Sequence, residues 1–464
     1  MALSRVNKSN LSLGVVILPK LKIAVVGSGI SGLSCAWALS QRHHVTLIES
    51  HHRLGGHANT VNVQTSAGPV AVDTGFIVFN SWTYPNFTAL MDYLDQPVIS
   101  TQMSFSVSAD AGRYEYSGHH LGTLFGASRQ WASPRHWKMM SDLLRFYRNA
   151  ESHAPHVEAG TSLGTYLQDY GYGDAFMQRH ILPMAGAIWS ATPDQIAAYP
   201  FHAFIKFFTN HKLFELGNRP DWNAVKGGSA DYVTKLAQDA RFDVRLSTPV
   251  DRVTRTSRGV EVHAINGGVE DFDHVVLATH ADTALRMLSA PTKDERDLLS
   301  PFKTSANRVY LHRDRALMPK GRRFWSGWNY RMPVQKTEAP EVTYWMNLLQ
   351  KLDSPDQHFV SLNPQVKPRA DLIDGTFDYH HPMFNDATMD AQKNLWSLQG
   401  EDRVWFCGAW FGAGFHEDGL QAGLAVAEQL GGVRRPWNVQ DESSRIHLGP
   451  RHFPLLNDIV EAAE

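Results

Sequence analysis

The chain is short of cysteine, of net charge and of long hydrophobic runs, and each shortage excludes a class of protein. Its two cysteines, Cys35 and Cys407, exclude a disulfide framework and a cysteine-built zinc site, and they fit a reducing cytosol. The 44 basic and 46 acidic side chains leave a formal net charge of −2, so no overall positive field favours nucleic acid as a partner. No run of about 18 apolar residues occurs, which argues against a membrane-spanning helix.

The composition is that of a globular protein with more than one domain. Of the 464 residues, 43% are hydrophobic and 19% charged, which excludes a disordered, collagenous or coiled-coil chain. This length exceeds what one hydrophobic core usually organises. The apolar stretch at 11–18 is too short to span a bilayer, and no small-residue cleavage site of a secretory signal follows it. We therefore expect residues 1–20 to be an N-terminal extension and the protein to be cytoplasmic, either soluble or peripheral on the inner membrane surface.

The strongest motif is a glycine-rich loop between a strand and a helix. The β-branched run at 23–26 suits a buried strand, the sequence GSGISG follows at 27–32, and residues 33–39 read as a helix. A second strand at 44–48 ends at Glu49. This order is the dinucleotide-binding fingerprint of a Rossmann-type α/β fold.

Each part of that fingerprint has a physical role. Gly27 allows the tight turn, Gly29 lets the backbone approach a pyrophosphate, and Gly32 lets the helix pack closely on the strand. The N-terminus of the helix offers unpaired N–H groups to the phosphates. Glu49 can accept hydrogen bonds from ribose hydroxyls.

The next segments distinguish FAD from NAD. The sequence RLGGH at 53–57 resembles the Arg-x-Gly-Gly continuation of the FAD-binding oxidoreductases that include monoamine oxidases, protoporphyrinogen oxidases and phytoene desaturases. In that group these residues lie along the pyrophosphate and the ribityl chain. The sequence VDTGF at 72–76 matches the group's segment beside the flavin ring. The resemblance implies FAD, bound without a covalent link because Cys407 lies outside the segment that monoamine oxidases use for attachment.

Three later segments fit the same group. Residues 243–253 read as two strand pieces around a turn and resemble the strand that contacts adenine, with Val250 at the contact. Residues 274–280 form a buried strand that ends in the small residues found near the pyrophosphate. Residues 403–407 form a strand before a glycine turn, and the helix that follows would present its N-terminal N–H groups at 418–420 to the flavin.

The resemblance implies one cofactor site and a domain organisation. The implied cofactor-binding residues are Gly27, Gly29, Ser31, Gly32, Glu49, Ser50, Arg53, Gly55, Gly56, His57, Thr74, Gly75, Phe76, Val250, Ala278, Thr279, Gly408, Ala409, Asp418, Gly419 and Leu420. The expected FAD-binding domain comprises residues 21–90, 215–290 and 395–432, the interleaved α+β substrate domain comprises 91–214 and 291–394, and 433–464 form a tail.

Several sequence segments make the resemblance more specific, and the resemblance extends over about residues 20–440. They are GFIVFN at 75–80, ILPMAGAIWS at 181–190 and the segment 406–423 around HEDG. They resemble a bacterial NAD/FAD-binding protein family whose genes often accompany cyclopropane-fatty-acid-synthase-like methyltransferases. Members of that family with an assigned role resemble the desaturase of furan fatty acid synthesis. This implies dehydrogenation of a methyl-branched acyl chain on a phospholipid, with an electron acceptor that the sequence does not identify.

The remaining segments hold most of the aromatic residues and suit a pocket over the flavin. The alternating run at 343–347 predicts a strand, although any single aromatic residue is more often core filler. The candidates near the flavin ring are Tyr330, Tyr344, Asn347 and His416, with His416 as the proton acceptor. Adjacent histidines on a strand point to opposite faces, so we expect no structural metal.

Two questions stay open at this level. The segment 133–150 predicts an amphipathic helix with Trp137, Leu144 and several basic residues, and it either packs on a core or contacts a membrane surface. The same flavin fold would also serve an amine oxidase or a non-redox flavin isomerase. We found no lysine in a convincing position for the water contact at flavin N5 that amine oxidases usually have.

Overall fold

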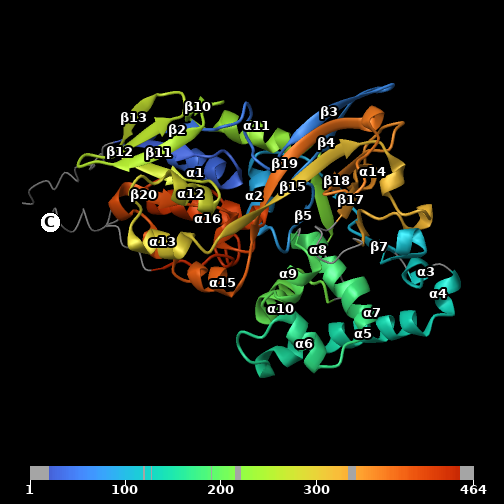
Figure 1. The fold of residues 1–464 in the computed structure, drawn as a ribbon. Helices are drawn as coiled ribbons and strands as arrows, with labels where there is room; N and C mark the ends of the chain where they lie inside the picture. The colour runs from blue at the N-terminus through green and yellow to red at the C-terminus, as the bar shows by residue number, and fades with distance from the viewer. Residues whose placement is uncertain are drawn as a thin grey trace, which may run out of the picture.

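The structure of the protein is a computed structural model. It describes residues 20–118, 121–126, 128–189, 191–214, 221–332 and 341–449. Nearly all of the predicted N-terminal extension and the end of the predicted tail lie outside the described residues. Figure 1 shows two lobes side by side, with a group of helices below the second lobe. No helix in the described part of the chain has the length and hydropathy to cross a bilayer.

The first lobe is built on a five-stranded sheet in which every pairing is parallel. In spatial order its strands are β10 (Asp243–Arg245), β2 (His44–Ile48), β1 (Lys22–Val26), β14 (His274–Leu277) and β20 (Val404–Phe406). β14 is buried throughout, and β1 and β2 are buried apart from their first residues, as their apolar runs predict. Strands that are far apart in the sequence therefore share one sheet, as expected for the interrupted Rossmann-type fold.

Two helices pack against each other beside this sheet. They are α1 (Ile30–Ser40) and α16 (His416–Gln429), and α16 begins before the predicted residue 420. A Cβ atom at Gly423 would lie 2.2 Å from the carbonyl oxygen of Ser31, so only glycine permits this approach. We expected the small residues of this helix to allow contact with the cofactor, but they allow contact with α1.

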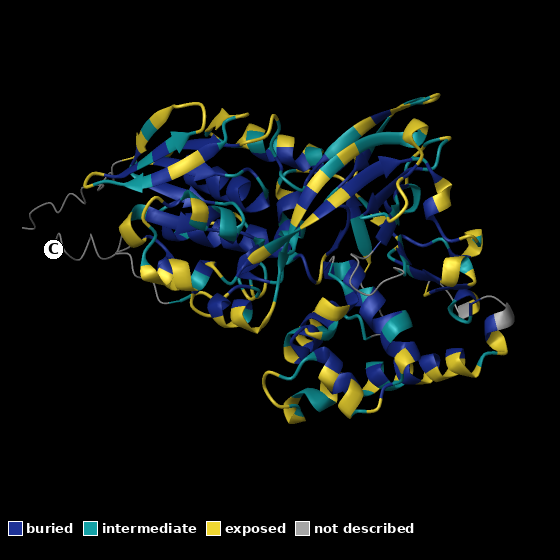
Figure 2. Ribbon diagram, in the orientation of Figure 1, coloured by how far each residue is buried: buried dark blue, intermediate teal, exposed yellow. Residues whose placement is uncertain are grey.

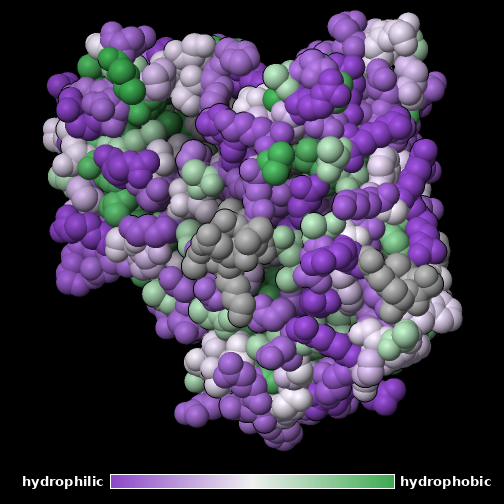
Figure 3. All heavy atoms as spheres, turned by 45° about the vertical axis from the view of Figure 1, so that its right-hand side comes forward, coloured by the Kyte–Doolittle hydropathy of each residue, from purple (hydrophilic) through white to green (hydrophobic). Residues whose placement is uncertain are grey.

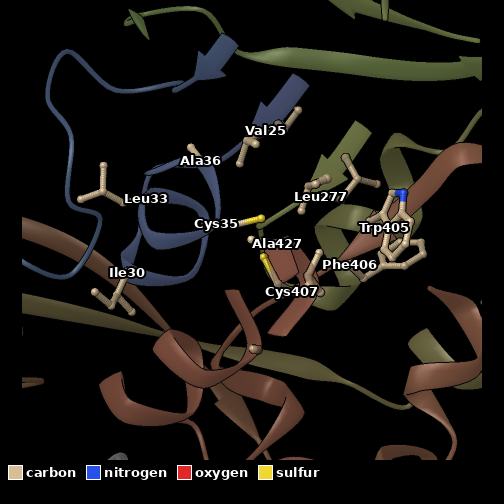
Figure 4. Packing of buried hydrophobic residues seen from close by; sticks show 14 of the residues in the cluster. Val25, Ile30, Leu33, Cys35, Ala36, Leu277, Trp405, Phe406, Cys407 and Ala427 are labelled. Carbon is tan, nitrogen blue, oxygen red and sulfur yellow. The ribbon is translucent and has the colours of Figure 1, made fainter. Parts of the chain in front are cut away.

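The two cysteines meet in the core of this lobe. Cys35 on α1 and Cys407 after β20 are fully buried free thiols, and their sulfur atoms face each other (Figure 4). Burial, and next a hydrogen bond with Cys407, raise the pKa of the Cys35 thiol. Both cysteines are packing residues, as predicted.

A small antiparallel sheet and several helices complete the first lobe. The sheet comprises β11 (Val250–Arg255), β12 (Val260–Ala264) and β13 (Val269–Phe272). The helices are α2 (Pro85–Tyr93), α11 (Ser229–Asp239), α12 (Ala281–Met287), α13 (Lys293–Leu299) and α15 (Asp386–Gln392).

The second lobe is built on a seven-stranded sheet. In spatial order its strands are β19 (Ile373–Met383), β15 (Lys303–His312), β18 (Phe359–Leu362), β17 (Glu341–Trp345), β16 (Trp328–Arg331), β7 (Phe105–Ala109) and β8 (Tyr114–Ser117). All neighbouring strands are antiparallel except β16 and β7. The predicted strand at 343–347 ends at Trp345, because Met346 begins the short helix α14 (Met346–Leu349).

Short strands connect the lobes, and helices cover one side of the second lobe. The short strands are β3 (Thr60–Thr65), β4 (Gly68–Asp73), β5 (Phe79–Asn80), β6 (Val98–Thr101) and β9 (Trp222–Val225). The helices are α3 (Leu121–Leu124), α4 (Ser128–Trp131), α5 (Pro134–His153), α6 (Leu163–Asp169), α7 (Asp174–Phe176), α8 (Leu182–Trp189), α9 (Pro193–Ala197) and α10 (Phe201–Asn210). The inner faces of these helices are buried and aromatic, and the outer faces are exposed (Figure 2).

Candidate functional site

A cavity of about 1140 Å³ is lined by residues from both lobes. From the first lobe it is lined by the loops after β1, β2, β14 and β20. These are carboxyl ends of parallel strands, where ligands of open α/β sheets bind. From the second lobe it is lined by residues of β7, β16, β17, β19, α8 and α10.

The N-terminus of α1 opens into this cavity. Gly29, Ile30 and Ser31 line the cavity wall, and the helix has neither a side-chain cap nor an acidic residue in its first turn. A Cβ atom at Gly29 would meet nothing within 4 Å. The first N–H groups and the positive end of the helix dipole are therefore free to bind an anion. This cradle fits the pyrophosphate of FAD.

The other two glycines of the motif shape the loop. Gly27 has φ +101°, and a Cβ atom there would lie 2.8 Å from the carbonyl oxygen of Ala278. A Cβ atom at Gly32 would lie 1.9 Å from the carbonyl oxygen of Gly27. Gly32 therefore lets α1 pack on the loop, and it does not itself line the cavity.

Glu49 joins the glycine-rich loop to the end of β2. Its Oε2 accepts hydrogen bonds from the backbone N–H and the hydroxyl of Ser28, at 2.9 and 2.6 Å. Its Oε1 accepts from the Ser50 hydroxyl at 3.0 Å and from the backbone N–H of His51 at 2.9 Å. A ribose hydroxyl can bind this carboxylate by replacing one of the two rotatable serine hydroxyls. The predicted role of Glu49 is thus compatible with its position.

Arg53 organises the second glycine loop. Its guanidinium donates hydrogen bonds to the carbonyl oxygens of Leu54, Gly56 and Ala58, at 3.2, 2.8 and 3.4 Å. Gly56 has φ +57°, and a Cβ atom there would lie 3.0 Å from the Cα atom of Gly29. The loop therefore lies directly on the first glycine motif. Burial lowers the pKa of Arg53 from its ordinary value.

His57 lies at the cavity wall with an unpaired ring nitrogen. Its Nε2 is buried without a hydrogen-bond partner, and its ring stacks on Tyr379 with 4.9 Å between the centroids. Burial, followed by the neighbouring His381, holds the pKa of His57 well below its ordinary range. The Tyr379 hydroxyl lies 2.8 Å from the hydroxyl of Thr74 and 2.9 Å from the Asn59 amide nitrogen. These hydrogen bonds fix the ring of Tyr379, and the ring of Tyr379 in turn supports the neutral imidazole of His57 by stacking.

His416 is placed at the wall by contacts with α11 and with the loop between β4 and β5. Its Nε2 lies 2.5 Å from the hydroxyl of Tyr232 on α11, and its ring stacks on Phe76 with 3.8 Å between the centroids. Burial lowers the pKa of His416 to about 3, so the ring is neutral near pH 7. Both tautomers of the neutral ring satisfy this contact, because the Tyr232 hydroxyl can donate to Nε2 or accept from Nε2–H.

The structure brings most of the predicted site residues to this one wall. The predicted residues that line the cavity are Gly27, Gly29, Ser31, Glu49, Ser50, Arg53, Gly56, His57, Gly75, Phe76, Ala278, Thr279, Tyr344, Gly408, Ala409 and His416. The predicted residues that do not line it are Gly32, Gly55, Thr74, Val250, Tyr330, Asn347, Asp418, Gly419 and Leu420.

The N-terminus of α16 is arranged differently from our expectation. The carboxylate of Asp418 accepts a hydrogen bond from the backbone N–H of Phe415 at 2.7 Å and pairs with Arg445 at 2.5 Å. A Cβ atom at Gly419 would lie 2.7 Å from the Ser31 hydroxyl, and Leu420 is fully buried. Residues 418–420 therefore serve the contacts of α16 with the protein, and the wall at this point is formed by His416 and Phe415.

Three other predicted residues also lie off the wall. Val250 borders a separate cavity of about 230 Å³, next to the end of β2. Tyr330 is 1% exposed and packs within the second lobe. The Asn347 amide donates to the carbonyl of Asp356 at 2.9 Å and its oxygen accepts from the backbone N–H of His358 at 2.7 Å. Tyr330 and Asn347 thus have structural contacts in place of the catalytic positions that we expected.

Sequence reasoning missed several residues of the wall. Tyr232 positions His416 from 184 residues away in the sequence. Tyr379 positions His57 from about 320 residues away. Met184 and Phe207 reach the wall from α8 and α10, and His211 follows α10 directly. No local motif marks such residues, because their positions depend on how the two lobes pack.

Comparisons with known proteins identify the family of this chain. Residues 30–373 match the family described as flavin containing amine oxidoreductase. An L-amino acid dehydrogenase of Synechocystis sp. is 24% identical over 284 residues, which cover 58% of this chain and 57% of that protein. The chain thus spans a little over half the length of that relative.

Solved structures of low sequence identity share the fold. Putrescine oxidase bound to putrescine has a TM-score of 0.63 at 14% identity, with 89% of this chain and 99% of that chain covered. Cyclohexylamine oxidase from Brevibacterium oxydans has a TM-score of 0.62 at 14% identity, covering 89% and 100%. A fatty acid isomerase from P. acnes has a TM-score of 0.61 at 15% identity, covering 88% and 98%. The family match over residues 30–373 shows that the chain belongs to the flavin-containing amine oxidoreductase family.

Proposed function

We propose that this protein removes two hydrogens from an apolar substrate, a methyl-branched fatty acyl chain carried on a phospholipid. One observation carries the proposal: the half of the cavity that faces the second lobe is apolar and aromatic. Its wall there comprises Met103, Phe105, Met184, Ile188, Trp189, Phe207, Leu213, Trp222, Trp328 and Tyr344. Such a wall favours a hydrocarbon chain by burying its surface away from water.

The charges of the wall also favour a neutral substrate. Among its described residues, the carboxylates are Glu49 and Asp378. Glu49 belongs to the glycine-rich loop, and Asp378 is exposed and pairs with Arg308. An ammonium group inside the cavity would therefore lack a carboxylate partner in the apolar half, where an unpaired charge is costly.

The size of the cavity allows a cofactor and a chain together. Its volume of about 1140 Å³ lies above the usual range of about 300–1,000 Å³ for a single small-molecule site. The fold also accommodates acyl substrates in other proteins, since the P. acnes neighbour is a fatty acid isomerase. Both points support a long substrate beside the flavin.

The residues of this chain would orient the substrate and accept a proton. When bound, FAD accepts the hydride that leaves one carbon of the chain. The aromatic wall holds the chain and excludes water. His416 is the proton acceptor for the neighbouring carbon: when its Nε2–H donates to the hydroxyl of Tyr232, the lone pair of Nδ1 takes the proton that leaves that carbon.

Removing the Tyr232 hydroxyl tests this role. Tyr232→Phe is expected to slow flavin reduction by the substrate about tenfold, and His416→Phe about a hundredfold, with flavin content unchanged in both. The phenyl ring of His416→Phe keeps the stack on Phe76. Anaerobic stopped-flow absorbance measures the rate. Tyr344→Phe, which also removes a hydroxyl from the wall, is the control and should retain the native rate. Equal rates for Tyr232→Phe and the native protein would contradict the assignment.

An amine oxidase is the second candidate, and it is favoured by the amine oxidases among the structural neighbours. Among the described residues of the wall, the one lysine is Lys212, whose ammonium lies over the ring of Trp82. Trp82 is 57% exposed, so its ring holds this ammonium toward the protein surface. This contact argues against Lys212 as the lysine that contacts water at flavin N5 in amine oxidases.

Mass analysis of the substrate decides between these functions. The holoprotein is incubated without oxygen with phospholipids that carry methyl-branched acyl chains, and separately with putrescine and cyclohexylamine. We expect lasting flavin bleaching and a loss of two hydrogens with the lipid only. Ile188→Trp, which narrows the apolar half, should retain FAD and lose this activity. Bleaching by an amine alone would establish the second candidate, and a product of unchanged mass without lasting bleaching would indicate an isomerase.

A further inference from the structure

The outer face of α4 and α5 carries exposed aromatic residues. Trp131 is 58% exposed, Trp137 is 47% exposed and Leu144 is 45% exposed. The indole N–H of Trp137 donates to the carbonyl of Trp131 at 2.8 Å, and the Phe125 ring contacts both indoles, with centroids 5.4 and 5.9 Å away. Hydrophilic residues predominate on the face of the molecule seen in Figure 3. In the described part of the chain the exposed large aromatic residues are Trp82, Tyr93, Trp131 and Trp137, and the last two contact each other.

Helical spacing places basic residues on the same outer face. Trp137, Leu144 and Arg148 follow one another at seven and four residues along α5, so they form one stripe. Arg135 and Lys138 are exposed beside this stripe. We call Trp131, Trp137, Leu144 and these three basic residues the α4–α5 face.

The charge of the α4–α5 face is positive. The nearest carboxylate, Asp142, is 1% exposed and pairs with Lys138 and Arg145 from beneath the face. The exposed Glu151 lies one turn past Arg148, toward the end of the helix. Arg135 and Arg148 therefore add positive charge on either side of the tryptophans, and this complements an anionic surface.

The core of the protein does not account for these residues. The opposite side of α5 already buries Met139, Leu143 and Phe146 in the second lobe. Tryptophan beside arginine and lysine is the composition of helices that lie at a membrane–water interface, where the indole enters the headgroup region and the cation binds phosphate. We propose that the α4–α5 face docks on an anionic phospholipid bilayer.

Vesicle binding tests this proposal without turnover. The full-length holoprotein is sedimented with vesicles of phosphatidylcholine, alone or mixed with phosphatidylglycerol. We expect binding to the anionic vesicles that weakens as salt is raised. Arg135→Glu combined with Arg148→Glu should weaken the partition coefficient at least about 25-fold, since each basic residue contributes about fivefold. Trp131→Ser combined with Trp137→Ser should weaken it at least about tenfold.

Matched variants elsewhere on the surface serve as controls. Arg252→Glu combined with Arg258→Glu changes charge equally, and Ile265→Ser removes a side chain that is 66% exposed; all should bind as the native protein does. Equal binding to neutral and anionic vesicles, or unchanged binding of the face variants, would overturn the proposal. A face variant that alters the oligomeric state would also overturn it, because the face would then join copies of the chain. Turnover of detergent-dispersed lipid is expected to persist in the face variants, so failure of vesicle binding is separable from failure of the proposed acyl function.

Discussion

Acidification below about pH 6 is expected to unfold the protein steeply. The reason is a set of imidazoles that are buried in their neutral form. Burial lowers the pKa of His211 to about 3, and the pKa values of His274 and His312 to about 4. All three side chains are almost fully buried, at 6%, 6% and 0% exposure.

The sign of the effect follows from where protons bind. In the unfolded chain a histidine titrates near its ordinary pKa of about 6.5, so between that pH and the lowered values the unfolded state binds more protons. The free energy of unfolding therefore falls as the pH falls through this window. Each histidine contributes about 1.4 kcal/mol per pH unit, and three give about 4 kcal/mol per unit. The free energy of unfolding of a domain is about 5–15 kcal/mol, so a fall of about two pH units removes most of it.

A single substitution isolates one of these contributions. The ring of His211 stacks on the ring of Phe207 with 3.8 Å between the centroids and lies 5.6 Å from the ring of Phe415, and its Nε2 is buried without a partner. His211→Phe keeps the ring stack and removes the titrating group, so it should reduce the slope by about 1.4 kcal/mol per pH unit. Urea unfolding at several pH values measures the slope. His156→Phe, at an exposed position, is the control. An unchanged slope in His211→Phe would contradict the explanation.

The parts of the fold that the sequence predicts are those whose signals are contiguous. The strand, glycine loop, helix and second strand at 22–48 each carry their own pattern of burial and turn residues, and they appear in the structure with small changes of boundary. The same holds for the turn between β10 and β11. Local patterns suffice here because each element is specified by its neighbours in the chain.

The parts that the sequence does not predict depend on distant partners. The glycine turn before α16 suggested a helix N-terminus open to the flavin, but Arg445 lies beyond the helix in the sequence and pairs with Asp418. The alternation at 343–347 likewise could not show that β17 ends at Trp345 and directs Asn347 to the 356–358 loop. Both differences come from tertiary contacts that override a local pattern.

A valine at the second glycine of the motif is expected to weaken FAD binding strongly and leave the protein folded. Gly29 has φ −61° and ψ 175°, which any residue adopts, and its Cβ position is free of protein atoms within 4 Å. The valine side chain would instead occupy the cradle at the N-terminus of α1. Steric conflict of this kind costs about 1–3 kcal/mol, or about fivefold to about hundredfold in FAD affinity.

The neighbouring Gly32 provides the contrast that makes this prediction specific. A Cβ atom at Gly32 would lie 1.9 Å from the carbonyl oxygen of Gly27 inside the protein. Gly32→Ala should therefore lower the melting temperature of the apoprotein, whereas Gly29→Val should lower only the flavin content. Visible absorbance and calorimetry of the two apoproteins measure the difference. Full flavin content in Gly29→Val would show that the pyrophosphate lies elsewhere, and an unstable Gly29→Val apoprotein would show that the cradle is part of the packed core. Substitution of Gly29 thus affects FAD binding because Gly29 faces the cavity, whereas substitution of Gly32 affects folding because Gly32 packs against the backbone.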